Sequence, residues 1–154
     1  MLCLISINYW AQVTDFQYEA VCEGSGLNGT HLIKIWVYGK KQKKAIDIAK
    51  KYAIESILFK GIASGKSGAC AKDPIIRNKE IIEKNKEYFD DFLKDNGSYL
   101  QYVSWSGDGS IDPQDIIQVS KKKYKVGMVV VVNFSDLKVT LQNDKIIKKF
   151  GDGL

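Results

Sequence analysis

The sequence predicts one α+β domain, a two-layer sandwich in which two or three helices cover a mixed, mostly antiparallel sheet. Three observations lead to this class. The chain has 154 residues, of which 45% are apolar, enough for one core. Stretches of β-strand character lie near both ends, and two helical patterns lie between them. With 27% charged residues and only two prolines, neither a disordered chain nor a low-complexity fibre fits.

The N-terminal stretch MLCLISINYWAQVTD contains the signal for where in the cell we expect the protein. Residues 2–10 are almost wholly apolar, no charge precedes Asp15, and Ala11-Gln12 resembles the end of a secretory signal that lacks its basic segment. We expect residues 1–11 to be a signal remnant and residues 12–154 to form the domain. The alternative is a first edge segment in a cytoplasmic protein. The apolar run is too short to span a bilayer.

The next two elements are expected to form a β-hairpin. The segment YEAVCEG over residues 18–24 alternates as a half-buried strand does. Asn28-Gly29 supplies strong turn chemistry, and THLIKIWVYG over residues 30–39 resumes the alternation. This is the clearest hairpin signal in the chain.

A helix is expected to follow within residues 40–59. Apolar residues recur there at helical spacing, with lysines on the opposite face. The spaced positions are Ala45, Ile48, Ala49, Tyr52, Ala53 and Ile57. Small alanines would allow the helix to lie close to a sheet.

The segment FKGIASGKSGACAKDP over residues 59–74 resembles a phosphate-binding loop, but the spacing of its glycines excludes that assignment. Gly61 and Gly65 are separated by three residues where four are required, and no apolar helix follows. We interpret residues 61–73 as a long surface connection without structure of its own, and such a connection is often functional. Its lysines and serine form the candidate interaction surface: Lys60, Lys66, Ser67 and Lys72.

The second half of the chain is expected to add one helix, three strands and a last helix. Residues 75–94 carry a helical stripe that Asn96-Gly97 ends, and residues 98–107 have strand character. Two more strands are expected on either side of Lys121–Lys123, with the apolar run 126–132 in a central position. Ser135-Asp136 would cap a final helix over residues 137–149.

The net charge of +5 comes from lysine clusters, since arginine occurs once, at Arg77. Lysine without arginine suits planar recognition of bases poorly, so the clusters indicate solvated faces with a secondary affinity for anionic surfaces. A nucleic-acid-binding module is the alternative function, because aromatic residues on the expected strands would stack bases. They are Trp36, Tyr38, Tyr99, Tyr102 and Trp105.

The cysteines fit an oxidising compartment. Removal of residues 1–11 takes away Cys3 and leaves Cys22 and Cys70, an even number. We predict that these two form a disulfide that tethers the long connection to the sheet edge; two unrelated thiols are the alternative.

No catalytic set emerges from the sequence. His31 is the single histidine, and nothing places it near Cys70, the one thiol in a loop. Asp108, Ser110 and Asp112 alternate as in a calcium loop, but Pro113 and Val119 stand where Gly and Glu are needed. We therefore expect a protein that is not an enzyme and needs no cofactor or metal.

The segments GTHLIKIWVYGKKQKKAIDIAKKYAIESILFKGI, YLQYVS and YKVGMVVVVNFSDLKVTL resemble a family of small secreted proteins of unassigned activity from Bacteroidetes-type bacteria. The strand followed by Ala45, Ala49 and Ala53 also resembles envelope domains of small lipoproteins, flagellar accessory proteins and curli secretion. The resemblance implies an exported periplasmic or outer-envelope domain that acts through contacts with a protein or envelope component. It carries no catalytic residue onto this chain, and nucleic acid is then an unlikely partner.

Overall fold

The computed structural model describes residues 18–39, 42–65 and 68–149. It contains an antiparallel five-stranded sheet in the order β1-β2-β5-β3, with β4 paired to the same side of β5 as β3. The strands are β1 (Tyr18–Ser25), β2 (Thr30–Gly39), β3 (Val103–Trp105), β4 (Ile116–Ser120) and β5 (Lys123–Asn133). The α+β class is confirmed, and every pairing between these strands is antiparallel.

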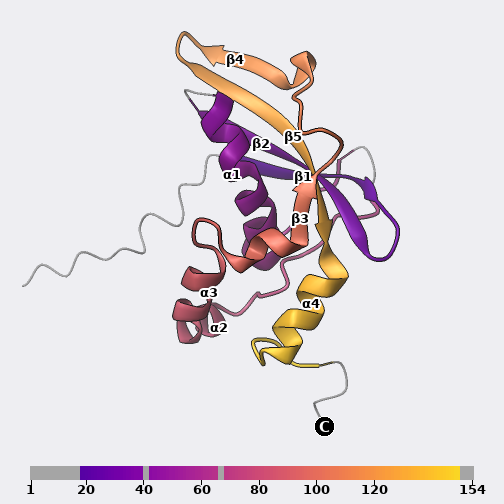
Figure 1. The fold of residues 1–154 in the computed structure, drawn as a ribbon, viewed down its shortest axis with the longest axis vertical. Helices are drawn as coiled ribbons and strands as arrows, with labels where there is room; N and C mark the ends of the chain where they lie inside the picture. Colours follow the sequence, from indigo (N-terminus) through magenta and orange to yellow (C-terminus); the bar gives the residue numbers. More distant parts are fainter. Residues whose placement is uncertain (1–17, 40–41, 66–67, 150–154) are drawn as a thin grey trace, which may run out of the picture.

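Four α-helices, two 3-10 turns and one π-helical turn complete the described fold (Figure 1). The α-helices are α1 (Gln42–Glu55), α2 (Lys79–Lys84), α3 (Lys86–Phe92) and α4 (Phe134–Asn143). A π-helical turn (Ser56–Lys60) continues α1, and 3-10 turns cover Ser98–Tyr102 and Pro113–Asp115. The described part of the chain has no helix with the length and apolar character needed to cross a membrane.

The core lies between α1 and one face of the sheet. Alternate residues of β2 and β5, such as Ile33, Ile35 and Val130, are fully buried there, as the alternation predicted. Ala49 and Ala53 of α1 are also fully buried. Alanines at this spacing keep the helix close to the sheet, which is the role the sequence indicated for them.

The β1–β2 hairpin forms where it was expected. Its turn places Asn28 at φ 55° and Gly29 at φ 73°, the left-handed conformation that Asn-Gly turns require. Gly29 also lies against α4, because a Cβ on it would stand 1.8 Å from the Ser135 hydroxyl oxygen. The hairpin turn and the start of α4 therefore touch.

Three expected elements differ from the structure. The helix expected over residues 75–94 begins only at Lys79 and breaks at Asn85 into α2 and α3. In the strand expected over residues 98–107, Ser98–Tyr102 form a 3-10 turn instead, and only Val103–Trp105 (β3) pair with β5. The last helix begins at Phe134, because Asn133 accepts the Asp136 backbone N–H and caps it.

The β4–β5 hairpin extends away from α2, α3 and α4 (Figure 1). Its strand β4 is exposed along most of its length, including Ile117 and Val119, which are 44% and 47% exposed. Lys121 and Lys122 separate the two strands, close to where the sequence predicted the division, and Lys123 begins β5.

Candidate functional site

A disulfide between Cys22 and Cys70 attaches the segment from Gly61 to Asp73 to the edge of the sheet. The Cα atoms of the two cysteines lie 5.4 Å apart, within the range that a disulfide requires, and both residues are fully buried. The predicted pairing is therefore present in the structure. We call this stretch, residues 61–73, the tethered segment.

Backbone hydrogen bonds hold the tethered segment beside β1. The Ala63 N–H donates to the Ala20 carbonyl (3.1 Å), and the Ala63 carbonyl accepts from the Cys22 N–H (2.9 Å). Ile62 and Lys72 exchange two further backbone bonds of 2.8 and 3.1 Å. The described part of this segment contains no helix or strand, as expected, but the Ala63 bonds attach it to the edge of β1.

The lysines of the predicted interaction surface do not converge. Lys60 Nζ lies 4.1 Å from the centroid of the Tyr18 ring, where β1 begins. Lys72 Nζ lies 4.4 Å from the Phe134 ring, at the start of α4 and beside the hairpin turn. Lys66 and Ser67 lie outside the described residues. The two described lysines thus stand near opposite ends of β1.

The sheet face opposite α1 carries aromatic and cationic side chains. Lys34 Nζ and Lys125 Nζ lie 4.9 and 5.1 Å from the Trp36 ring centroid. Lys125 Nζ also lies 5.2 Å from the Tyr38 ring. Gly127 makes room for the indole, since a Cβ there would stand 2.8 Å from a Trp36 ring carbon. These residues form a half-exposed surface that we call the cationic aromatic face.

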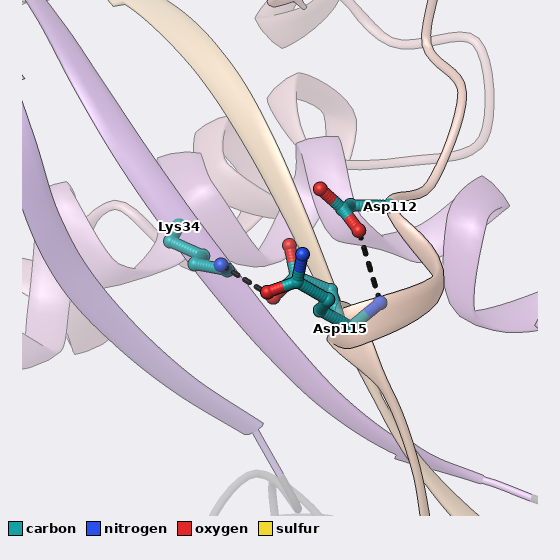
Figure 2. Close-up of polar contacts among 4 residues, drawn as sticks. Lys34, Asp112 and Asp115 are labelled. Carbon is teal, nitrogen blue, oxygen red and sulfur yellow. Dashed lines mark hydrogen bonds and ion pairs between the residues drawn. The ribbon is translucent and has the colours of Figure 1, made fainter.

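Acidic partners neutralise much of this face. Figure 2 shows the ion pair of Lys34 with Asp115 (2.6 Å), whose side chains are only 13% and 18% exposed. The Asp112 carboxylate accepts the backbone N–H of Gln114 and so caps the turn that carries Asp115. Across the face, hydrogen bonds from Lys125 and the Tyr38 hydroxyl lower the pKa of Glu19.

Asp115→Asn is expected to lower the free energy of unfolding by about 1–3 kcal/mol, because it leaves Lys34 largely buried without its charged partner. Urea denaturation measures the change. The matched control is Asp73→Asn, which removes an exposed ion pair with Arg77 and should change stability by less than about 0.5 kcal/mol. Equal losses in the free energy of unfolding for the two substitutions would show that burial does not make the Lys34–Asp115 pair more important than an exposed one.

The other aromatic residues of the nucleic-acid hypothesis lie elsewhere. Tyr99 and Tyr102 belong to the 3-10 turn, and Tyr99 is 5% exposed. Trp105 is paired with the buried Val130, and Lys50 of α1 lies 5.0 Å from its ring, so it faces the helix side. Of the aromatic residues proposed to stack bases, only Trp36 and Tyr38 remain on the cationic aromatic face.

A buried carboxyl group at the end of α1 escaped the sequence analysis. Glu55 is 7% exposed, and its Oε2 atom has no hydrogen-bond partner among the described residues. Burial raises the pKa of Glu55 to about 7, against the opposing charges of Lys51 and Lys60. Such a shift marks many functional sites. Glu55, however, lines neither the pocket between α3 and α4 nor the pocket at the start of α4.

The residues considered for chemistry are not assembled into a catalytic set. Cys70 is engaged in the disulfide and offers no thiol nucleophile. Asp108 accepts the Ser110 N–H within an exposed turn, and Asp112 caps the next one. Within residues 18–39, 42–65 and 68–149, no cluster of three His, Cys, Asp or Glu side chains suits a metal. His31 lines a separate pocket beside α4.

Comparison with models of known protein families, with curated proteins and with solved structures finds no match for this chain. The resemblance to secreted and envelope proteins therefore stays an expectation from the sequence.

Proposed function

We propose that this chain is an exported periplasmic or outer-envelope domain that acts through contacts with a protein or envelope component and not through catalysis. The observation that carries the proposal is the buried disulfide between Cys22 and Cys70. Structural disulfides persist in oxidising compartments and are rare in the reducing cytosol. The signal-like residues 1–11, which lie outside the described residues, support the same location.

The tethered segment supports a binding role. The disulfide and four backbone bonds order a stretch rich in small residues at the edge of the sheet. A loop that a rigid scaffold positions in this way commonly carries binding residues. The proposed contact surface is this segment with Lys60 and Lys72, with Lys66 and Ser67 between them in sequence.

The location is tested by trapping thiols in the source cells. Cells are quenched in acid, free thiols are alkylated, and the protein from each cell fraction is analysed by mass spectrometry. We expect the protein in the envelope or secreted fraction, with a peptide pair linked through Cys22 and Cys70. Cytosolic protein in which both cysteines are alkylated would overturn the proposal.

The binding role is tested by lysine-reactive cross-linking in the same cells. Cross-links from Lys60 or Lys72 to another envelope component are expected. Replacing Lys60 and Lys72 by alanine should leave the remaining cross-links within this chain unchanged but remove those to the partner. Cross-links to the partner that persist in full in this variant would exclude the proposed surface.

A second candidate function, single-stranded nucleic acid binding, is favoured by the cationic aromatic face, where Trp36 and Tyr38 lie beside three lysines: Lys34, Lys123 and Lys125. Stacking on aromatic rings with nearby cations is the usual mode of such binding. Two of the lysines are already paired with carboxylates, which weakens the case.

Fluorescence anisotropy with a labelled single-stranded oligonucleotide distinguishes this second function. If it holds, binding weakens steeply with salt, and Trp36→Ala reduces it by roughly 1–3 kcal/mol. Leu100→Ala, a change at an exposed position of the 3-10 turn Ser98–Tyr102, serves as the control. Binding that is equal for the wild type and Trp36→Ala would exclude this face.

A further inference from the structure

A pocket of about 360 Å³ opens between the β1–β2 turn, the tethered segment and the start of α4. It has an aromatic wall, Phe134, whose ring centroid lies 5.0 Å from that of His31. The residues around it are mostly polar: Gly29, His31, Lys72, Phe134, Ser135, Lys138, Val139 and Gln142. Three segments that are distant in the sequence thus meet at one hollow.

His31 is the unusual member of this pocket. It is 6% exposed, and neither of its ring nitrogens has a hydrogen-bond partner among the described residues. The Thr30 backbone lies near enough to raise the pKa of His31 but makes no hydrogen bond of normal geometry with the ring. Leaving a buried polar group unsatisfied is costly, so proteins rarely keep one without a role or a bound molecule.

The charge of the pocket identifies the kind of molecule that would satisfy His31. Lys72 and Lys138 line the pocket from two different segments, and no carboxylate lines it. Asp136, the acidic residue of α4, accepts a hydrogen bond from the Asn133 amide instead. Two ammonium groups, a serine hydroxyl and an imidazole make a set of donors suited to oxygen anions.

We propose that this pocket binds a phosphate group, with Lys72 and Lys138 neutralising its charge and His31 and Ser135 donating hydrogen bonds to its oxygens. The volume exceeds that of phosphate alone, and Phe134 and Val139 offer apolar surface, so a phosphate ester fits better than the free ion. The inference does not depend on where in the cell the protein works.

Protonation of His31 should accompany binding. Without a ligand, burial first and the positive charge of Lys72 second keep the pKa of His31 below its ordinary value. Lys72 and Lys138 are the charged groups that line the pocket around it, while its strand neighbours Ser25 and Val132 carry no charge. A bound anion favours the imidazolium, so it raises this pKa and affinity increases as the pH falls.

The first test observes the imidazole directly. His31 is the single histidine of the chain, so protein made without a histidine tag gives one set of imidazole signals in NMR. Titration with inorganic phosphate should shift these signals saturably, whereas chloride at equal ionic strength should not. The absence of a saturable shift overturns the proposal.

Matched charge variants separate the pocket from general attraction to lysines. Lys72→Ala with Lys138→Ala should weaken phosphate binding about tenfold or more. Lys121→Ala with Lys122→Ala removes the same charge from the exposed end of the β4–β5 hairpin and should leave binding unchanged. Equal loss in both double variants would show nonspecific attraction and overturn the site.

Sulfate keeps its charge between about pH 5.5 and 8, so it reports the role of His31 without titration of the ligand. Calorimetry should show tighter sulfate binding at the lower pH in the wild type. His31→Gln retains hydrogen bonding but cannot be protonated in this range, so it should bind with little pH dependence. A pH dependence that is unchanged in His31→Gln would contradict the assigned role.

The source of the phosphate is distinguished with two further probes. Glycerol 3-phosphate that binds at least as tightly as phosphate indicates a soluble ester. Binding only to phosphatidylcholine vesicles that contain phosphatidylglycerol, lost in the Lys72 and Lys138 double variant, indicates a lipid headgroup. Vesicle binding that this variant retains, without binding of either soluble probe, would refute the pocket.

Discussion

Replacing Cys22 and Cys70 together by alanine is expected to lower the free energy of unfolding by about 4 kcal/mol. The bond joins residues separated by 48 positions, and closing a loop of this length restricts the unfolded chain by that amount in the chain-entropy model. Domains of this size are stable by roughly 5–15 kcal/mol, so the loss is a large part of the total. The midpoint of urea unfolding, measured without reductant, reports it.

The single variants distinguish a bond from two separate packing contributions. If the disulfide forms, Cys22→Ala, Cys70→Ala and the double variant all lose the same bond and show similar losses. If the thiols are free, the two single losses add up in the double variant. Cys3→Ala serves as the background, because it leaves the pair intact and removes the third thiol from disulfide exchange.

The tethered segment should lose more of its protection from hydrogen exchange than the rest of the fold when Cys22 and Cys70 are both replaced by alanine. Its backbone bonds to β1 join single residues, so they are weak without the covalent link. In the double cysteine variant, the amides of Cys22, Ile62 and Ala63 should exchange hydrogen faster relative to those in the centre of β2. Uniform acceleration across the fold would indicate a global loss of stability and no local role for the tether.

The parts of the fold that the sequence predicted are those with strong local periodicity. The hairpin follows from strict alternation around Asn28-Gly29, and α1 follows from alanines at helical spacing. The long run 126–132 lies in β5, which pairs with β2 on one side and with β3 and β4 on the other. In each case the local pattern and the tertiary environment favour the same conformation.

The mispredicted parts are those where a specific local contact decides the conformation. Asn85 donates its side-chain amide to the Ile81 carbonyl and breaks a helix that the apolar stripe alone would continue. The β-formers of residues 98–102 adopt a 3-10 turn, and Tyr99 is buried in it. Asn133 caps α4 ahead of the serine that the sequence favoured. Short polar side chains compete with regular structure by hydrogen-bonding to the backbone, and the hydrophobic periodicity of a sequence does not reveal such bonds.

The sites were predicted less well than the fold because they depend on distant segments. Cysteine counting indicated the disulfide, and the strand pattern of residues 18–24 placed Cys22 in the first strand. The pocket around His31, in contrast, needs Lys72 and Lys138 from two other segments. The burial of Glu55 arises only where the helical pattern of α1 passes into the π-helical turn. No local spacing in the sequence marks either environment.

Glu55→Gln is expected to remove a pH dependence of stability worth roughly 3 kcal/mol. In the folded protein, burial raises the pKa of Glu55 from 4.5 to about 7. The unfolded chain therefore loses this proton at lower pH than the folded one, and rising pH favours unfolding. The contribution of Glu55 to stability is fully present below about pH 4.5, falls between about 4.5 and 7, and is absent above that range.

The measurement is the free energy of urea unfolding across this range for the wild type, Glu55→Gln and Glu55→Met. In the pH range where Glu55 titrates, the free energy of unfolding of both variants should change less with pH than that of the wild type, because neither variant has a titrating group at position 55. Their absolute stabilities can differ. The amide of Gln needs hydrogen-bond partners that Met does not, so Met is expected to be the more stable variant. Glu83→Gln, at an exposed position of α2, should reproduce the wild-type profile. A Glu55→Gln profile parallel to that of the wild type would mean that the carboxyl group reaches water in solution, and the buried position at the end of α1 would then be wrong.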